Sequence, residues 1–243
     1  MVMSENTVNV IDGSTFLISD RYGDARAQSK SRKTDGLFYR DMRHLSTLDL
    51  TIKGAPVELL STNNTNYYAA SFFLALDTGS MQRFHCIPEV SVIRHRTLLR
   101  VLREEVTLQN HSHREFPIEL EIQIAADFAD LFEVKDKVIE KTGLLERSRD
   151  GETILFSYTR DGFERGTEIE FLVPASAELL LDCPDDVREP VRAAVTFGLP
   201  ARSELTLALN VFPYEGDEEL EELRRRHGFI QVRSWLQEDL RRW

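Results

Sequence analysis

Alternation of apolar and polar residues with a period of two dominates the first 213 residues of this chain. The clearest case is residues 118–124, Ile-Glu-Leu-Glu-Ile-Gln-Ile, in which every second side chain is apolar. Residues 105–110 show the same alternation, and a polar loop joins the two segments. Because such strands present one apolar and one polar face, the pattern predicts a β-hairpin with one face on a core and the other in water.

Similar strands are expected at short spacing along the chain, and many are separated by turn dipeptides. The turns are Asp12-Gly13, Lys53-Gly54, Asp150-Gly151 and Asp161-Gly162. About a dozen short strands with almost no helical periodicity favour an all-β fold, a large antiparallel β-sandwich over residues 1–213. The further strands are expected at residues 8–11, 15–18, 45–52, 57–61, 67–74, 90–98, 153–159, 167–173, 177–181, 191–197 and 205–212.

Helical patterning begins after residue 213. Asp217 can cap a helix whose first turn is acidic and whose last turn, residues 224–226, is basic, and this order complements the helix dipole. Gly228 is placed to end that helix. Residues 214–243 are therefore expected to form short C-terminal linker helices.

A second, shorter helix is expected to follow, because Ser234 and Gln237 resemble a capping box. A helix of this length is marginal alone and needs a surface to pack against. The sandwich and a following domain are both open as that surface. The apolar residues that would share one helical face are Leu236, Leu240 and Trp243.

Two segments combine dense charge with large apolar residues: 35–45 and 127–134. Charges among aromatic residues are costly to bury unless they are paired, so each segment is either a structural ion-pair corner or part of a recognition surface. Asp127, Asp130 and Glu133 would share one face of a helical turn, and could pair with Arg40 or Arg43 or bind sugar hydroxyls. Residue types alone favour charge pairing. The candidate site residues are Asp35, Arg40, Asp41, Arg43, His44, Asp127 and Asp130.

The net charge of −11 argues against nucleic acid or an anionic membrane as a partner, whereas a neutral sugar fits it. Cys86 and Cys183 form no CxxC pair, which is typical of free thiols in a reducing compartment. The first ten residues show no signal peptide, and no apolar run is long enough to span a membrane. We therefore expect a cytoplasmic protein.

Motifs for nucleotide, dinucleotide, nucleophile-elbow and zincin sites are absent, and no cofactor is expected. His111 and His113 could present two metal ligands, but the sequence offers no evident third, so no metal site is predicted. Glycoside hydrolysis needs two facing carboxylates, and the sequence cannot select such a pair among 41.

Residues 35–46 and 127–135 both resemble the N-terminal domain of bacterial and archaeal glycogen-debranching-enzyme-like proteins of the amylo-α-1,6-glucosidase type. Residues 58–61 and 104–110 are similar to the same family, and the resemblance runs in order over about residues 7–243. Met42 stands where the family usually has Thr, with its charged neighbours kept.

This resemblance implies a galactose-mutarotase-like β-supersandwich, followed in the family by an (α/α)6 barrel that carries the catalytic acids. No residues here match those acids, so the chain is expected to be non-catalytic by itself. It would support that barrel, in cis or in trans, or contribute to binding an α-glucan or oligosaccharide. Residues 214–243 would lead into the barrel, which is absent from this chain.

Two alternatives stay open at this point. One is a stand-alone sugar epimerase, in which His44 or His95 acts with Glu89 or Glu104 as acid and base. The other is a protein-interaction module that dimerises through its terminal helices.

Overall fold

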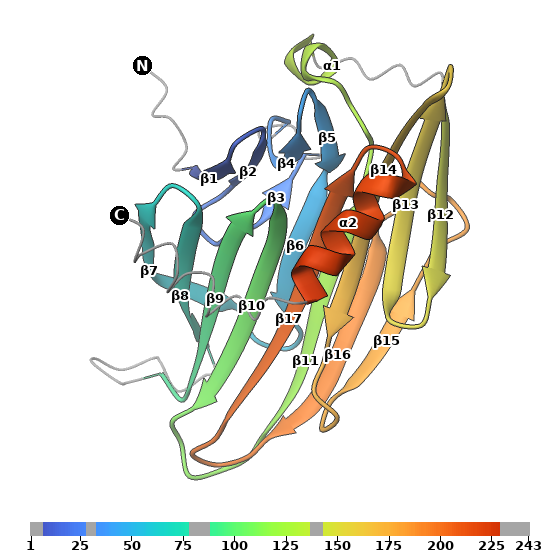
Figure 1. Cartoon of the computed structure of the whole chain (residues 1–243). Coiled ribbons are helices and arrows are strands. Elements are labelled where there is room, and N and C mark those ends of the chain that lie inside the picture. The colour runs from blue at the N-terminus through green and yellow to red at the C-terminus, as the bar shows by residue number, and fades with distance from the viewer. Residues whose placement is uncertain (1–6, 28–32, 78–87, 137–142, 229–243) are drawn as a thin grey trace.

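The computed structural model describes residues 7–27, 33–77, 88–136 and 143–228 (Figure 1). Over these residues the strands form three sheets, and every pairing between neighbouring strands is antiparallel. The two larger sheets pack face to face over a common apolar core. The expected all-β antiparallel sandwich is confirmed.

The largest sheet has eight strands and is the front layer in Figure 1. In spatial order its strands are β12 (Leu144–Asp150), β13 (Thr153–Arg160), β14 (Phe163–Leu172), β17 (Glu204–Tyr214), β10 (Val101–Asn110), β9 (Val90–Leu99), β8 (Ala69–Leu76) and β7 (Val57–Asn66).

The second layer has five strands, and a four-stranded sheet lies at one end of the sandwich. The five are β15 (Glu178–Asp182), β16 (Val191–Leu199), β11 (Phe116–Ala125), β6 (Thr47–Ile52) and β3 (Ala25–Arg26). The four are β1 (Val8–Asp12), β2 (Thr15–Ser19), β4 (Gly36–Tyr39) and β5 (Met42–Leu45).

The expected hairpin of residues 105–110 and 118–124 is wrong. Strand β10 pairs with β9 and β17 in one layer, whereas β11 pairs with β6 and β16 in the other. Asn110 holds the crossing loop, since its Nδ2 donates to the carbonyls of Arg114 and Leu199 and its Oδ1 accepts from Ser112 N. Both strands bury one apolar face in the same core, so their alternation is identical whether they pair or face each other.

The expected strand at 45–52 is two strands in different sheets. β5 ends at Leu45 and β6 begins at Thr47, and Ser46 between them donates its backbone N–H to Ala125 O at 2.8 Å. β12 was not expected, because only its first residues, Leu144 and Leu145, are apolar. The Asp161-Gly162 turn is confirmed: both residues have positive φ, and the flanking residues pair directly.

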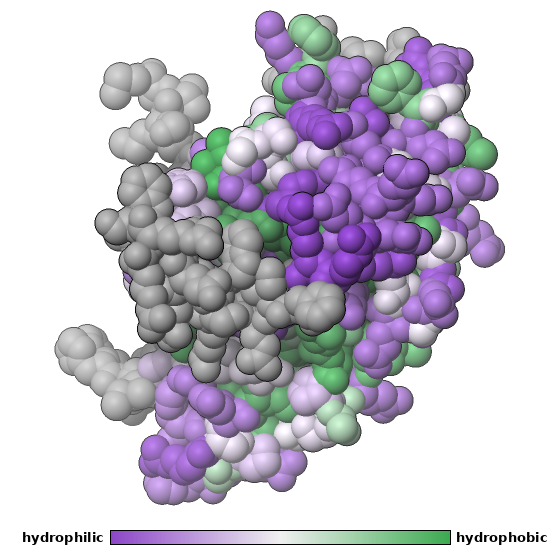
Figure 2. Space-filling view, in the orientation of Figure 1, coloured by the Kyte–Doolittle hydropathy of each residue, from purple (hydrophilic) through white to green (hydrophobic). Residues whose placement is uncertain are grey.

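The structure has two helices in its described residues, α1 (Leu131–Asp136) and α2 (Asp217–Gly228). The predicted helix from Asp217 to Gly228 is confirmed. α2 lies across the outer face of the eight-stranded sheet, where Leu220 and Leu223 pack against Phe212 and Tyr214 (Figure 1). Its exposed side forms a strongly hydrophilic surface (Figure 2). The second predicted helix, with Ser234, Gln237 and Trp243, lies outside the described residues.

Candidate functional site

Residues 36–45 form the β4–β5 hairpin, with Arg40 and Asp41 in its turn. Gly36 has φ of +135°, and a Cβ there would lie 2.4 Å from the carbonyl oxygen of Leu45. Only glycine fits this backbone position without displacing β5. Arg43 and His44, next to each other on β5, are both buried.

Arg43 is 2% exposed and holds Asp127 in a bidentate pair. Its Nε lies 3.0 Å from Asp127 Oδ1 and its Nη2 lies 2.6 Å from Oδ2. The remaining Nη1 donates to the carbonyls of Lys33 and Asp35. The two charged segments are therefore joined by a planar guanidinium–carboxylate pair, the arrangement that such groups favour when buried. We call Arg43, His44, Asp127 and Asp130 the corner.

Backbone hydrogen bonds reinforce the corner. Arg43 N donates to Ala129 O at 2.8 Å, and Leu131 N donates to Asp41 O at 3.1 Å. The segment after β11 thus continues along the edge of β5. Phe128 adopts a left-handed backbone with φ of +48° and buries its ring against His44.

Asp130 and Glu133 form a capping box at the start of α1. Asp130 Oδ1 accepts from Phe132 N and Glu133 N, at 2.8 and 2.9 Å, and Glu133 Oε2 accepts from Asp130 N. The expectation that Asp127 shares a helical face with these residues is wrong, because α1 begins only at Leu131 and Phe128 breaks the helical geometry.

His44 is completely buried and links β5 to β14. Its Nδ1 lies 3.0 Å from both Gly166 O and Thr167 Oγ1, and Thr167 Oγ1 donates to His44 O. Because a carbonyl can only accept, Nδ1 carries the proton. Burial lowers the pKa of His44 to about 3, so the ring stays neutral near physiological pH. Its Nε2 finds no hydrogen-bond partner among the described residues.

Arg40 does not pair with either aspartate of the second segment. It pairs with Glu215, just before α2, and Arg165 approaches the same carboxylate at 2.8 Å. Beside it, Glu219 of α2 accepts from Tyr39 Oη at 2.7 Å. The β4–β5 turn is thereby fastened to the start of α2.

The other two candidate residues differ in setting. Asp35 is 1% exposed, and its Oδ2 accepts from Arg26 N at 3.3 Å. Asp41 is exposed at the tip of the hairpin. The structure thus brings Arg43 and Asp127 into contact, places Asp130 next to them through the backbone, and directs Arg40 elsewhere.

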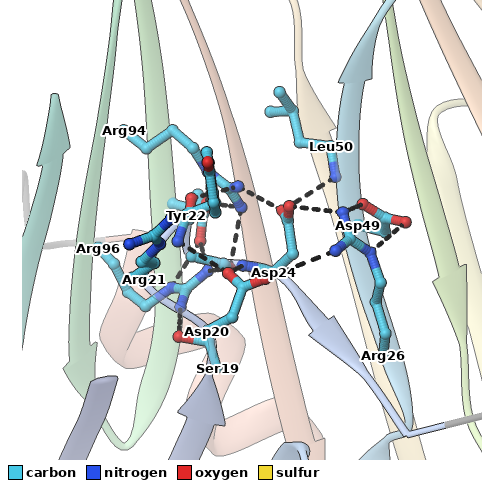
Figure 3. Close-up of polar contacts among 12 residues, drawn as sticks. Ser19, Asp20, Arg21, Tyr22, Asp24, Arg26, Asp49, Leu50, Arg94 and Arg96 are labelled. Atoms are coloured by element: carbon cyan, nitrogen blue, oxygen red, sulfur yellow. Dashed lines mark hydrogen bonds and ion pairs between the residues drawn. The ribbon is translucent and has the colours of Figure 1, made fainter. Parts of the chain in front are cut away.

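Sequence reasoning missed a network of charged side chains in the core, formed by Asp24, Arg94, Arg96 and Glu104. We call these four residues the buried network; none is more than 3% exposed. Figure 3 shows Asp24, Arg94 and Arg96 of this network. Arg94 Nε and Arg96 Nε each lie 2.7 Å from one oxygen of Glu104. Mutual attraction dominates at Glu104: burial alone would raise its pKa, but Arg94 and Arg96 hold that pKa below its ordinary value.

The two arginines of the buried network also bind the segment between β2 and β3. Arg94 Nη1 donates to Tyr22 O at 2.9 Å, and Arg96 Nη2 donates to Gly23 O at 2.6 Å. Gly23 has φ of +90°, and a Cβ there would crowd Phe72 at 3.0 Å. The signal for this network was present in the alternation of β9, whose buried positions 90, 92, 94, 96 and 98 include both arginines.

The structure does not bring His95 together with Glu104, one of the acid–base pairs of the epimerase alternative. His95 pairs across the sheet with Glu105, on the face opposite Glu104, and hydrogen-bonds Ser71 Oγ at 2.9 Å. Glu89 lies just before the start of β9, whereas Arg100 lies just after its end. Because the charge of Arg100 acts on His44, His44 and Glu89 are near opposite ends of this strand.

Metal binding by the histidine loop gains no support. His111 Nε2 lies 2.8 Å from Ser91 Oγ, and His113 Nε2 accepts from Arg202 at 3.0 Å. Within the parts of the chain that the structure describes, no three His, Cys, Asp or Glu side chains gather closely enough to hold a metal ion. Neither described helix is long and apolar enough to cross a bilayer.

The fold and the corner define a class: an antiparallel β-sandwich domain whose buried charges are paired within the domain. A family model described as the N-terminal domain of some glycogen debranching enzymes matches residues 10–210. The chain belongs to this family. No curated protein matches its sequence.

Solved structures share the fold at low sequence identity. The Slr1438 protein from Synechocystis is 10% identical with a TM-score of 0.53, over 88% of this chain and 97% of that one. A protein from the human microbiome named as a kojibiose phosphorylase is 10% identical with a TM-score of 0.50, over 81% of this chain. This chain spans 27% of the length of that protein. A galactose mutarotase related enzyme from Lactobacillus acidophilus is 9% identical with a TM-score of 0.45, over 86% of this chain and 97% of that one.

Proposed function

We propose that this chain is a non-catalytic β-sandwich domain of an amylo-α-1,6-glucosidase-type debranching enzyme, and that its α1 end faces the (α/α)6 catalytic domain, in cis or in trans. Membership of the debranching-enzyme family supports this role. The enzyme as a whole would act on an α-glucan. A reducing, cytoplasmic setting agrees with Cys183, a half-buried free thiol.

The observation that carries the proposal is how fully the corner is engaged in structural contacts. Arg43 donates hydrogen bonds to Asp127 and to two backbone carbonyls, and Asp130 caps α1. His44 is locked against Thr167 with a pKa of about 3, far from the value that suits a general acid or base at neutral pH. These groups are built to hold the backbone in place.

The rim of the corner is suited to contact a partner. Phe132 on α1 is 76% exposed, Leu131 beside it is 38% exposed, and Asp41 is exposed at the adjacent hairpin tip. Buried aromatic anchors with a polar rim are typical of protein interfaces. Because the capping box and the backbone bonds to β5 fix α1, Phe132 is presented on a rigid support.

The contacts of α2 fit the same role. Glu215 and Glu219 tie its start to Arg40, Arg165 and Tyr39, and so orient the helix relative to the corner. The resemblance to the family implies that the segment after the sandwich leads into the catalytic barrel. A helix fixed in this way would set the direction in which the chain leaves the sandwich.

Co-expression with the (α/α)6 domain of a family enzyme tests the proposal. Phe132→Asp is expected to weaken co-purification of the two domains, because it places a charge at the centre of the contact. Leu180→Asp is the matched control, since Leu180 is 65% exposed on the distant edge strand β15. Equal loss in both variants, or none in either, would refute the interface.

The absence of catalysis in the isolated chain is tested separately. The purified chain is expected to release no glucose from a branched α-glucan, and mixing it with the catalytic domain is expected to restore or raise hydrolysis. Glucose release by the chain alone would overturn the non-catalytic role.

A further inference from the structure

A hollow of about 490 Å³ lies on the outer face of the eight-stranded sheet, beside α2. Strands β12 and β13 extend the sheet beyond the helix at this point (Figure 1). The floor consists of two neighbouring rows of cross-strand residues. The first row is Ser148, Leu155, Glu168 and Phe212, and the second is Asp150, Thr153 and Glu170.

Two of the polar groups in the hollow are held in place by hydrogen bonds. Glu168 is 5% exposed and is gripped by Arg224 of α2, whose Nε lies 2.9 Å from Oε1. In the second row, Glu170 Oε2 accepts from Asn210 Nδ2 at 2.9 Å, and Asn210 Oδ1 accepts from Arg103 at 3.0 Å. These side chains therefore need little reordering when a ligand arrives.

Hydrogen-bond donors and acceptors line the hollow together with the apolar side chains of Leu155 and Phe212. Ser148 and Thr153 offer hydroxyls and Arg224 a guanidinium, while Glu170 and Asp150 offer carboxylate oxygens. Sugar hydroxyls both donate and accept, so a polyol can use every one of these groups. The volume falls within the range of small-molecule sites, about 300–1,000 Å³.

Other ligand classes fit less well. An anion would be repelled by three carboxylates, those of Asp150, Glu168 and Glu170. The described residues contain no group of His, Cys, Asp and Glu side chains arranged for a metal ion. Arg224 is paired with Glu168, so the carboxylates of Asp150 and Glu170 leave the lining with a net negative charge, and an organic cation is the competing ligand that the test below includes.

We infer that this hollow binds a neutral oligosaccharide, a linear α-glucan segment, outside the catalytic domain. The inference rests on the proposed role in a glucan-processing enzyme and adds a separate holding site for the polymer. The hollow is formed by the outer face of the sheet, whereas Arg43 and His44 of the corner are buried within the protein. Sugar binding and domain contact therefore use different residues.

The test is a nuclear magnetic resonance titration of the full chain with maltoheptaose. Amide shifts are expected at residues 148–155 and 168–170. Glu170→Gln removes one charged acceptor while keeping its shape, and is expected to raise the dissociation constant about fivefold. Ser148→Trp fills the hollow from exposed β12 and is expected to abolish the shifts there.

Glu178→Gln is the matched control, because Glu178 is an exposed strand carboxylate on β15 in the other sheet. It should leave the affinity unchanged. The inference is overturned if millimolar maltoheptaose shifts no amides, if the shifts fall on residues 40–43 and 127–132, or if Ser148→Trp binds as tightly as the parent. It is also overturned if spermine, a cationic probe, produces the shifts and maltoheptaose does not. A chain that binds the catalytic domain but not the sugar would refute this inference and leave the proposed function intact.

Discussion

The corner and the buried network use the same chemical groups in two different settings. In the corner, Arg43 is buried but its partner Asp127 keeps 25% of its side-chain surface in contact with solvent. In the buried network, Arg94, Arg96 and Glu104 each retain only 1%. One pair lies at the edge of the sandwich and the other cluster lies between its layers.

The two clusters differ in what offsets the free-energy cost of removing their charged groups from water. Asp127 remains partly hydrated, and its carboxylate is met by the bidentate contact with Arg43 and by a hydrogen bond from Ala129 N. Glu104 has lost its water and depends on two guanidiniums, which in turn depend on it. Removing one member of such a group leaves an unpaired buried charge, which costs far more than the pair contributes.

The largest expected effect follows from removing the charge of Glu104. Glu104→Gln should lower the free energy of unfolding by about 3–5 kcal/mol, because two buried guanidiniums lose their shared carboxylate. Urea unfolding followed by circular dichroism measures this change.

The next residue along β10 is the matched control. Glu105 lies on the opposite face of the sheet, is 40% exposed, and pairs with Arg103 at 3.0 Å. Glu105→Gln should cost at most about 1 kcal/mol, as exposed ion pairs do. Similar losses in both variants would show that water reaches Glu104 and would remove the contrast between the two settings.

A smaller effect is expected in the corner. Asp127→Asn keeps the shape of the side chain but leaves buried Arg43 without its counter-charge, and should cost about 2 kcal/mol. Asp130→Asn is the control, because Asn caps a helix nearly as well as Asp, and it should change stability by only a few tenths of a kcal/mol. If Asp130→Asn is the more damaging variant, α1 and not the ion pair holds the corner.

The contrast between the clusters also explains what the sequence could predict. The corner was visible because its charges are dense along the chain: Arg40, Asp41, Arg43 and His44 fall within five consecutive positions. The buried network was not visible in this way, since Asp24 lies 70 residues from Arg94. Its local traces are the two arginines on the buried phase of β9 and Glu104 on the buried phase of β10.

The strands themselves were largely predictable, but their partners were not. A period of two reports that one face is buried, and β10 and β11 satisfy this from opposite layers. Assigning them to one sheet or two requires long-range pairing, which no local pattern contains. The same limit applied to Arg40, whose partner Glu215 lies 175 residues away.

The most specific effect concerns the proton balance of His44. Its pKa is lowered from 6.5 to about 3 in the folded protein, chiefly by burial. Between these values the unfolded chain binds more protons than the folded one, so the free energy of unfolding falls as the pH falls. The contribution of His44 to the free energy of unfolding is fully present above pH 6.5 and is lost as the pH falls toward 3. Over this range the free energy of unfolding changes by at most about 1.4 kcal/mol per pH unit through this group.

His44→Asn isolates this contribution, because Asn offers an N–H donor toward Gly166 O but does not titrate. Its free energy of unfolding should fall less steeply than that of the parent as the pH is lowered from 6.5. Other acid-sensitive groups, Glu104 among them, are common to both proteins and cancel in the difference. Parallel profiles would mean that solvent reaches Nε2 of His44. The β5–β14 contact would then be hydrated, as Asp127 is, and only the buried network would remain free of water.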